Sequence, residues 1–148
     1  MITLEELEDC VRSRPMPGGN LTIESYESQI LDYALCAADG DRILAHPMWF
    51  VVASVRCLGV TTAEFCQMAA MNDLDALLFG GVELHQIRPL LVGGDYSTKV
   101  DVTGVKRRRA RDGATLDCID IRVEVVDADG NSYGSVISNY LIKRSEEK

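Results

Sequence analysis

The most informative stretch of the chain is Pro47-Met48-Trp49-Phe50-Val51-Val52-Ala53-Ser54-Val55. Proline suits the first turn of a helix, and a glycine such as Gly59 suits the end of one. Apolar side chains then go nearly all the way round the helix, whereas a surface helix keeps one polar face. We therefore expect a central, buried helix that begins near Pro47 and ends near Gly59.

Three further helices are expected around this one. Thr3 followed by Glu6 is a capping box, so a helix should begin there and end before the loop 15–20. Thr22 has the character of the next N-cap, with a helix that reaches Ala38. Its apolar residues fall at helical spacing and should pack inward: Ile23, Tyr26, Ile30, Tyr33 and Ala37. A last helical piece is expected over residues 62–71.

The second half of the chain has the two-residue period of β-strands. Residues 116–126 alternate between apolar and polar side chains, 127–131 have the composition of a hairpin turn, and 133–142 return as a last strand. Shorter runs with strand character lie at 82–87 and 100–109. A buried helix followed by such strands predicts an α+β fold, in which a long antiparallel sheet wraps around the helix. The edge strand of that sheet would be open to a second copy.

Composition narrows the function classes. The chain has 148 residues and a formal net charge of -8, which argues against a general nucleic-acid binder. No apolar run approaches the roughly 20 residues of a membrane span, and residues 1–6 do not resemble the start of a secretory signal. The five cysteines are scattered and form no Cys-x-x-Cys pair. We therefore expect a cytoplasmic protein without a metal or other cofactor.

Several stretches, taken in order, resemble one known family. They are residues 22–34, residues 45–50, the run Leu84-His85-Gln86-Ile87-Arg88-Pro89-Leu90 followed by Gly94-Asp95, and residues 123–130. The family is that of the MaoC-like acyl dehydratases and hydratases, which have the hotdog fold, and the chain is most similar to the N-terminal half of its two-part dehydratases. The resemblance implies a single hotdog domain over 1–148, with an N-terminal helix and loop over 1–19 and the hotdog core over 20–148.

The resemblance also implies a reaction. The family adds water to, or removes it from, acyl thioesters of coenzyme A or acyl carrier protein, with an Asp and a His sharing the proton transfers. Its catalytic loop reads Gly-Asp-x-Asn-Pro-aliphatic-His, and residues 40–46 keep the Gly, the Asp and the His at that spacing. Asp41 and His46 are then the catalytic candidates. In a second alignment His46 and Pro47 begin the central helix, the segment before them is deleted, and the site is degenerate. The sequence is compatible with both alignments.

Further residues are candidates for substrate binding: Asp39, Trp49, His85, Arg107 and Arg109. A structural role is the alternative, in the core for Trp49 and on a strand for His85. The two arginines belong to a basic run, and residues 105–112 hold five bases and one acid, a net charge of +4. Such a run suits the phosphates of coenzyme A or an acidic carrier protein, and its structural alternative is a solvated hairpin.

Three functions are therefore in competition. The first is an acyl-thioester dehydratase or hydratase of the MaoC-like type, which is a hydro-lyase. The second is a non-catalytic hotdog subunit that pairs with a catalytic MaoC-like chain and shapes its acyl pocket. The third is a hotdog thioesterase or another divergent enzyme of small molecules. We expect a homodimer, or a heterodimer with another hotdog chain, and neither nucleic acid nor a membrane as partner.

Overall fold

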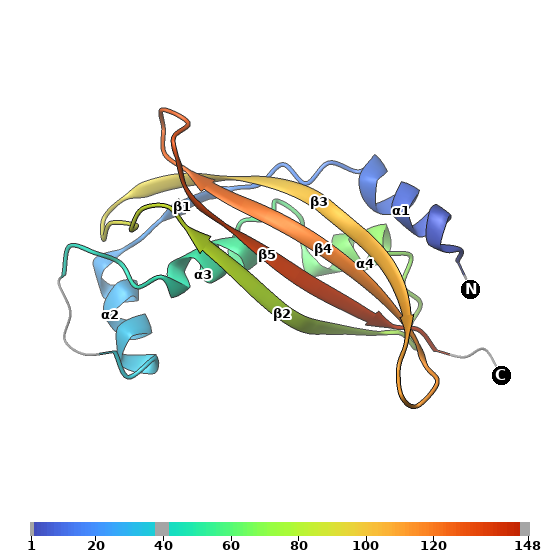
Figure 1. The fold of residues 1–148 in the computed structure, drawn as a ribbon. Coiled ribbons are helices and arrows are strands. Elements are labelled where there is room, and N and C mark those ends of the chain that lie inside the picture. The colour runs from blue at the N-terminus through green and yellow to red at the C-terminus, as the bar shows by residue number, and fades with distance from the viewer. Residues whose placement is uncertain (1, 38–41, 146–148) are drawn as a thin grey trace.

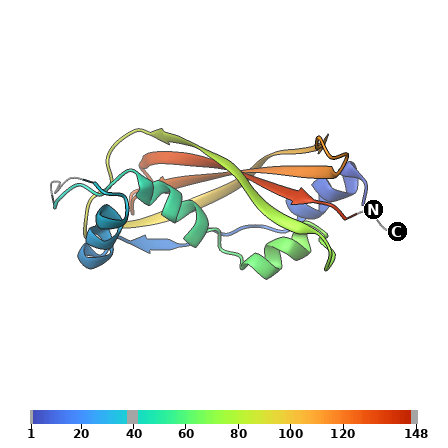
Figure 2. The same ribbon diagram turned by 90° about the horizontal axis from the view of Figure 1, so that it is seen from below.

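A computed structural model of the chain describes residues 2–37 and 42–145. Five antiparallel strands form one sheet in the order β1-β3-β4-β5-β2. The strands are β1 (Asn20–Thr22), β2 (Ala76–Gln86), β3 (Asp95–Arg109), β4 (Thr115–Val126) and β5 (Ser132–Lys143). The helices are α1 (Leu4–Ser13), α2 (Ser25–Ala34), α3 (Met48–Arg56) and α4 (Thr62–Met68). The sheet curves over α3 and α4, which confirms the expected wrapping of a long sheet around a helix (Figures 1 and 2).

The alternation along β4 explains which face of the sheet is buried. Ile119, Ile121, Val123 and Val125 point to one face and are at most 1% exposed. The first three pack in a cluster with side chains of α1 and α4, whereas Val125 packs in a second cluster with Phe50 and other side chains of α3. Because successive side chains of a strand point to opposite faces, the intervening residues of β4 lie on the outer face of the sheet.

The segment after the first loop differs from the prediction. Residues 20–22 form strand β1, because they pair with the start of β3 and bury Leu21. Thr22 is therefore not an N-cap: its hydroxyl donates to the Asp95 carboxylate at 2.5 Å. Helix α2 begins after Glu24 and ends at Ala34, ahead of a left-handed Cys36 (φ 51°), so it is shorter than the predicted helix to Ala38.

Two helices leave apolar side chains in solvent where the sequence predicts packing. Tyr26, Ile30 and Tyr33 of α2 are all exposed. Helix α3 buries Trp49, Phe50 and Ala53 against the sheet, but its Val55 is 59% exposed. The prediction of an enclosed central helix is thus correct for one side only, because the sheet covers α3 from one side (Figure 2).

The two edges of the sheet are built differently. At the β3 edge, β1 covers the first residues, and farther along the strand the Arg12 guanidinium donates to the Val102 carbonyl at 2.7 Å next to a bulge at Thr103. Such devices keep an edge from pairing with another chain. At the β2 edge, the eleven residues of the strand pair with β5 alone among the described strands. Among the described strands, β2 therefore has a long edge that is open to a partner.

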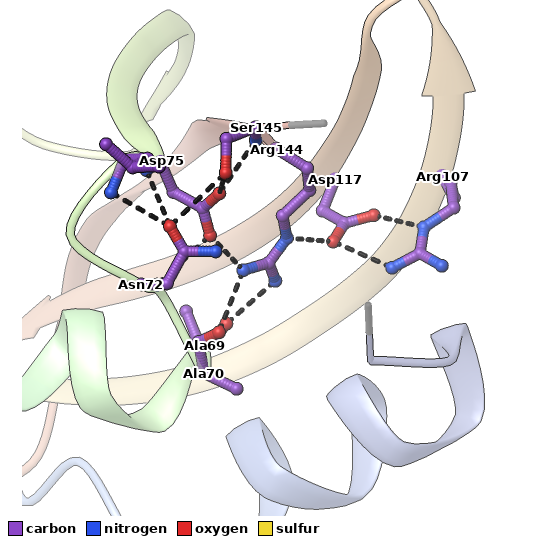
Figure 3. A network of polar contacts seen from close by, with 9 residues as sticks. Ala69, Ala70, Asn72, Asp75, Arg107, Asp117, Arg144 and Ser145 are labelled. Carbon is purple, nitrogen blue, oxygen red and sulfur yellow. Dashed lines mark hydrogen bonds and ion pairs between the residues drawn. The ribbon is translucent and has the colours of Figure 1, made fainter. Parts of the chain in front are cut away.

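A buried ion-pair network fastens the end of β5 to the rest of the molecule (Figure 3). The Arg144 side chain is 4% exposed and donates to Asp117 at 2.7 Å and to Asp75 at 2.9 Å. Its remaining bonds go to the carbonyls of Ala69 and Ala70, just after α4. One guanidinium thus links the end of β5 with β4 and with the α4–β2 connection.

Candidate functional site at the start of the central helix

Strand-like contacts hold the chain just ahead of α3. Leu44 forms an isolated antiparallel bridge with Leu91. The Ala45 amide donates to the Leu90 carbonyl at 2.9 Å, and Leu90 itself is buried. These bonds fix the position of the chain just before α3 begins. His46 lies at this point, and imidazole is a side chain that takes part in acid–base catalysis.

The His46 side chain caps the helix that it precedes. Its Nδ1 accepts a hydrogen bond from the Met48 amide at 3.1 Å. The Trp49 amide donates to the His46 carbonyl at 2.9 Å, and the Phe50 amide donates to the Pro47 carbonyl at 3.0 Å. The first three amides of α3 therefore have acceptors within the chain, although the start of a helix usually leaves amides free.

This cap restricts what the imidazole does chemically. A neutral imidazole has one N–H and one free lone pair, and here the lone pair of Nδ1 is taken by the Met48 amide. The ring proton then lies on Nε2, so that nitrogen donates and does not accept. Likewise, the amides of Trp49 and Phe50 are not free to stabilise an oxyanion. In this arrangement the Nδ1 atom of His46 acts as a cap for α3. The catalytic role that the sequence predicts for His46 stays a prediction.

The proposed acid–base partner is not placed by the structure. Asp41 and the binding candidate Asp39 both lie outside the described residues. Their predicted roles beside His46 therefore stay predictions.

Trp49 lies in the core, as expected if its role is structural and it does not bind substrate. It is 2% exposed, and the Arg56 guanidinium lies over its ring at 5.9 Å from the centroid. Its indole Nε1 is buried without an acceptor among the described residues. A role for Trp49 in lining an acyl pocket stays a prediction.

His85 lies on the opposite face of the sheet from His46. Its neighbour Leu84 is opposite Val136, which is fully buried in the cluster around α3. Because side chains alternate along a strand, His85 points to the outer face, opposite Ser135. The structure therefore does not bring the two histidines of the chain together.

Arg107 is committed to a contact within the chain. Its Nε donates to Asp117 at 2.6 Å and its Nη2 donates to the same carboxylate at 2.9 Å, which is a bidentate pair. Burial by itself raises the pKa of Asp117, but the bonds from Arg107 and Arg144 outweigh it and hold that pKa below its ordinary value. The Arg107 guanidinium, which the sequence predicts to contact a substrate phosphate, is thus already paired with the Asp117 carboxylate. Arg109, by contrast, is exposed and has no ion pair among the described residues.

Both arginines also lie far along the sheet from His46. The hairpin between β3 and β4 is at the opposite end of the molecule from the start of α3 (Figure 1). Within one chain, the structure therefore does not assemble the predicted site from His46 and the basic run.

An apolar surface joins α3 to the open edge of the sheet. Phe79, Val82 and Leu84 of β2 point to the helix side of the sheet, and all are exposed. Met48 and Val55 of α3 are exposed as well. We call these five residues the β2–α3 surface. Exposed apolar patches that adjoin an open strand edge are typical of protein interfaces.

Sequence reasoning missed the buried network and most of this surface. The burial of Asp117 was visible in the sequence pattern. Asp117 occupies an inward position of the alternating strand that continues with Ile119 and Ile121. Arg144 is likewise in phase with the buried Ile142. A charged residue in phase with a buried apolar series requires a buried partner of opposite charge. The exposure of α3 had no such signal, because an apolar surface looks the same in sequence whether the chain or a partner covers it.

The described ranges contain neither a candidate metal cluster nor a helix that could span a membrane. No group of three or more His, Cys, Asp and Glu side chains within residues 2–37 and 42–145 is arranged to hold a metal ion. None of the helices described has the length and apolar character needed to cross a membrane.

The capping role of His46 predicts a specific mutational pattern. His46→Ala removes the acceptor for the Met48 amide and should lower the free energy of unfolding by about 1 kcal/mol. His46→Asn should recover most of that loss, because asparagine is among the best capping residues. Urea unfolding of the three proteins measures the difference. Equal stability of the alanine variant and the wild type would contradict the capping role.

Comparisons with known proteins reveal the fold at low sequence identity. No protein-family model matches the chain, and no curated protein is detectably similar in sequence. A chain of the ChsH1–ChsH2 complex from Mycobacterium tuberculosis matches with a TM-score of 0.70 at 13% identity, over 99% of this chain and 96% of that one. A chain of the HadBC (3R-hydroxyacyl-ACP dehydratase) complex from Mycobacterium tuberculosis matches with a TM-score of 0.62 at 12% identity, over 86% of this chain and 98% of that one.

A third similar structure is longer than this chain. The MaoC-like dehydratase from Phytophthora capsici matches with a TM-score of 0.66 at 17% identity, over 95% of this chain and 50% of that one. The chain thus spans about half the length of that protein. At these identities the likeness establishes the fold and no more. The predicted hotdog fold is confirmed.

Proposed function

We propose that the chain is the non-catalytic subunit of a MaoC-like acyl-thioester dehydratase or hydratase. It pairs with a second hotdog chain, which supplies the acid and the base, and its own apolar side chains help to form the acyl pocket. The observation that carries this proposal is the use of the His46 Nδ1 to cap α3, together with the internal acceptors of the following two amides. While these bonds are made, neither the Nδ1 lone pair nor the amides of Trp49 and Phe50 are available for the reaction, and this supports a non-catalytic role.

The open edge supports the pairing half of the proposal. Strand β2 has eleven residues and pairs with β5 on one side, so its other side exposes a row of N–H and C=O groups, and the β2–α3 surface places apolar side chains beside that row. An antiparallel edge strand from a second hotdog chain satisfies these groups and covers Val82, Leu84 and Val55 in one step. The similar chains of ChsH1–ChsH2 and HadBC are themselves parts of complexes, and the Phytophthora protein has about twice the length of this chain.

A catalytic hydro-lyase is the competing function. The spacing of Gly40, Asp41 and His46, which matches the catalytic loop of the MaoC-like family, favours it. In that case the His46 ring leaves its capping position when substrate binds, and Nδ1 or Nε2 becomes the proton acceptor. The two functions differ in one respect that is measurable: whether an imidazole at position 46 is needed for turnover.

Reconstitution tests the proposed function. The chain is mixed with a MaoC-like chain of the same organism that keeps the complete catalytic loop, and mass is measured by light scattering. Hydration of 2-enoyl-coenzyme A substrates of short, medium and long acyl chain is then followed for the mixture and for each chain alone. We expect a 1:1 complex whose kcat/KM for at least one acyl length exceeds that of the catalytic chain alone, and no turnover by this chain alone. Turnover by this chain alone, or failure to form the complex, would count against the proposal.

A further inference from the structure

The end of the β3–β4 hairpin carries an excess of positive charge that the chain does not neutralise. Two acidic residues lie in or next to this region, and both already have partners. Asp112 accepts from Lys143 at 2.7 Å, and Asp117 is shared by Arg107 and Arg144. The acids that would offset the basic run are thus committed to other cations.

The remaining cations of the run are free among the described residues. Lys106, Arg108, Arg109 and Arg111 are exposed, and none has an ion pair within the described ranges. We call residues 106–111 the basic hairpin. In a chain with a net charge of -8, such a local excess of cations attracts an anionic partner to this end of the sheet.

The shape of the basic hairpin favours a protein surface over a small phosphate. The hairpin projects from the end of the sheet (Figure 1). Lys106 and Arg108 are opposite Cys118 and Leu116 and so point to the outer face, whereas Arg109 points to the other face. Charges spread over both faces of a protrusion do not enclose a single phosphate. They match the broad acidic surface of a docked protein, which typically covers about 800 Å² of each partner.

Pairing through β2 determines where this protrusion lies in the assembled dimer. The hairpin is at the end of the sheet where β2 begins, since Ala76 is opposite Lys143, which in turn is opposite Leu116. The other end of β2 adjoins α3: Gln86 is opposite Gly134, where a Cβ would lie 2.9 Å from the Phe50 ring.

An antiparallel partner edge reverses this direction. The basic hairpin of this chain therefore lies at the end of the dimer where the partner subunit's central helix begins. From β4 to the partner's edge strand there are three strand spacings, or about 14 Å. A protein docked on the hairpin is thus within its own width of the partner's helix start.

We infer that the basic hairpin is the docking surface for an acidic carrier protein that delivers the acyl thioester to the partner subunit. The place of delivery rests on the proposed function. The docking rests on the uncompensated charge and on the projecting shape. The non-catalytic subunit then contributes carrier recognition as well as structure.

Binding of a purified acidic acyl carrier protein, in its holo form, tests this inference on the assembled complex. Arg108→Glu/Arg111→Glu reverses two exposed charges of the hairpin. The matched control, Arg14→Glu/Lys99→Glu, makes the same change in net charge at exposed sites elsewhere. We expect the hairpin variant to raise the Kd at least tenfold at low salt and the control to change it less than twofold. Raising the salt from about 0.05 to 0.5 M should weaken wild-type binding and remove most of the difference.

Each result of this experiment has a definite meaning. No binding by the wild type, or an equal loss in the control, overturns the inference. Coenzyme A is the second ligand to test. If it displaces the carrier protein at concentrations near the Kd of coenzyme A itself, and if the hairpin variant binds coenzyme A at least tenfold more weakly, the hairpin is a phosphate site and the inference is overturned. If the carrier protein binds as expected but the complex has no hydration activity, the proposed function fails and the docking surface stands. Unfolding midpoints of both variants should equal that of the wild type, because none of the four residues is buried.

Discussion

Arg144→Met is expected to lower the free energy of unfolding by about 3–5 kcal/mol, the usual cost of removing one partner from a buried ion pair. Methionine fills similar space but leaves Asp75 without its cationic partner, Asp117 with Arg107 alone, and two carbonyls without donors. For a domain of this size the midpoint of thermal unfolding should fall by roughly 6–20 °C.

The neighbouring residue offers a matched control for this substitution. Lys143→Met removes an exposed cation that, among the described residues, forms its ion pair with the exposed Asp112. Surface pairs of this kind add little to stability, so its unfolding midpoint should stay close to that of the wild type. Urea unfolding at neutral pH compares the three proteins. Equal losses in both variants would show that the buried network has no special weight.

The network also predicts how stability depends on pH. Burial raises the pKa of Asp75 and of Asp117. Hydrogen bonds from Ser145 and Arg144 to Asp75, and from Arg107 and Arg144 to Asp117, outweigh burial, so both pKa values are lower than usual. A carboxylate with a lowered pKa in the folded state stabilises the fold above its unfolded pKa, about 3.9, and loses that contribution as the pH falls toward the folded value. The difference between wild type and Arg144→Met should therefore be largest near neutral pH and shrink below about pH 4.

Val82→Lys is expected to break the complex while leaving the subunit folded. Val82 lies at the middle of the β2 edge and is 45% exposed in the isolated chain, so a lysine there costs the subunit little. In a dimer joined through β2 the same ammonium is buried without an anion. A cost of about 3 kcal/mol corresponds to a hundredfold increase in the Kd of the complex.

Size measurement by light scattering, with circular dichroism of each subunit, tests this expectation. The control is Leu74→Lys, which places the same charge at a leucine that is 79% exposed in the loop before β2. We expect the Leu74 variant to form the complex and the Val82 variant to remain unpaired with a native spectrum. A Val82 variant that pairs as tightly as the wild type would exclude the β2 edge as the interface.

The fold was predictable from periodicity, and the misses have identifiable causes. Alternation over 116–126 and the apolar run at 47–55 were sufficient to predict a sheet around a helix, because burial of those side chains dominates the folding free energy. The strand at Asn20–Thr22 was missed, because three residues are too few to show a period and the Thr22 hydroxyl suits a cap as well as a bond to Asp95. The α2 helix shows the opposite error, since the spacing of Tyr26, Ile30 and Tyr33 predicts an inward face but does not say which surface covers it.

The candidate site was less predictable than the fold. The spacing of Asp41 and His46 is a property of the chain, whereas the role of His46 depends on which atom its Nδ1 meets, and that atom is the Met48 amide two residues later. A histidine directly before Pro47, at the start of a helix, can be either a catalytic residue or a cap. The local sequence does not distinguish these two roles. For Arg107, the ion pair with Asp117 could have been predicted, because the two residues are opposite each other on paired strands and both point inward.

The most direct test of the central claim is the kcat of the reconstituted complex when this chain carries His46→Asn. Asparagine keeps the cap on α3 but has no acid–base function near neutral pH, so the substitution separates the two roles of residue 46. If the chain is the non-catalytic subunit, kcat for 2-enoyl-thioester hydration should stay within about threefold of the wild-type complex. A fall of about 10²–10⁴-fold, the contribution of a positioned acid or base, would contradict it and make His46 a catalytic residue.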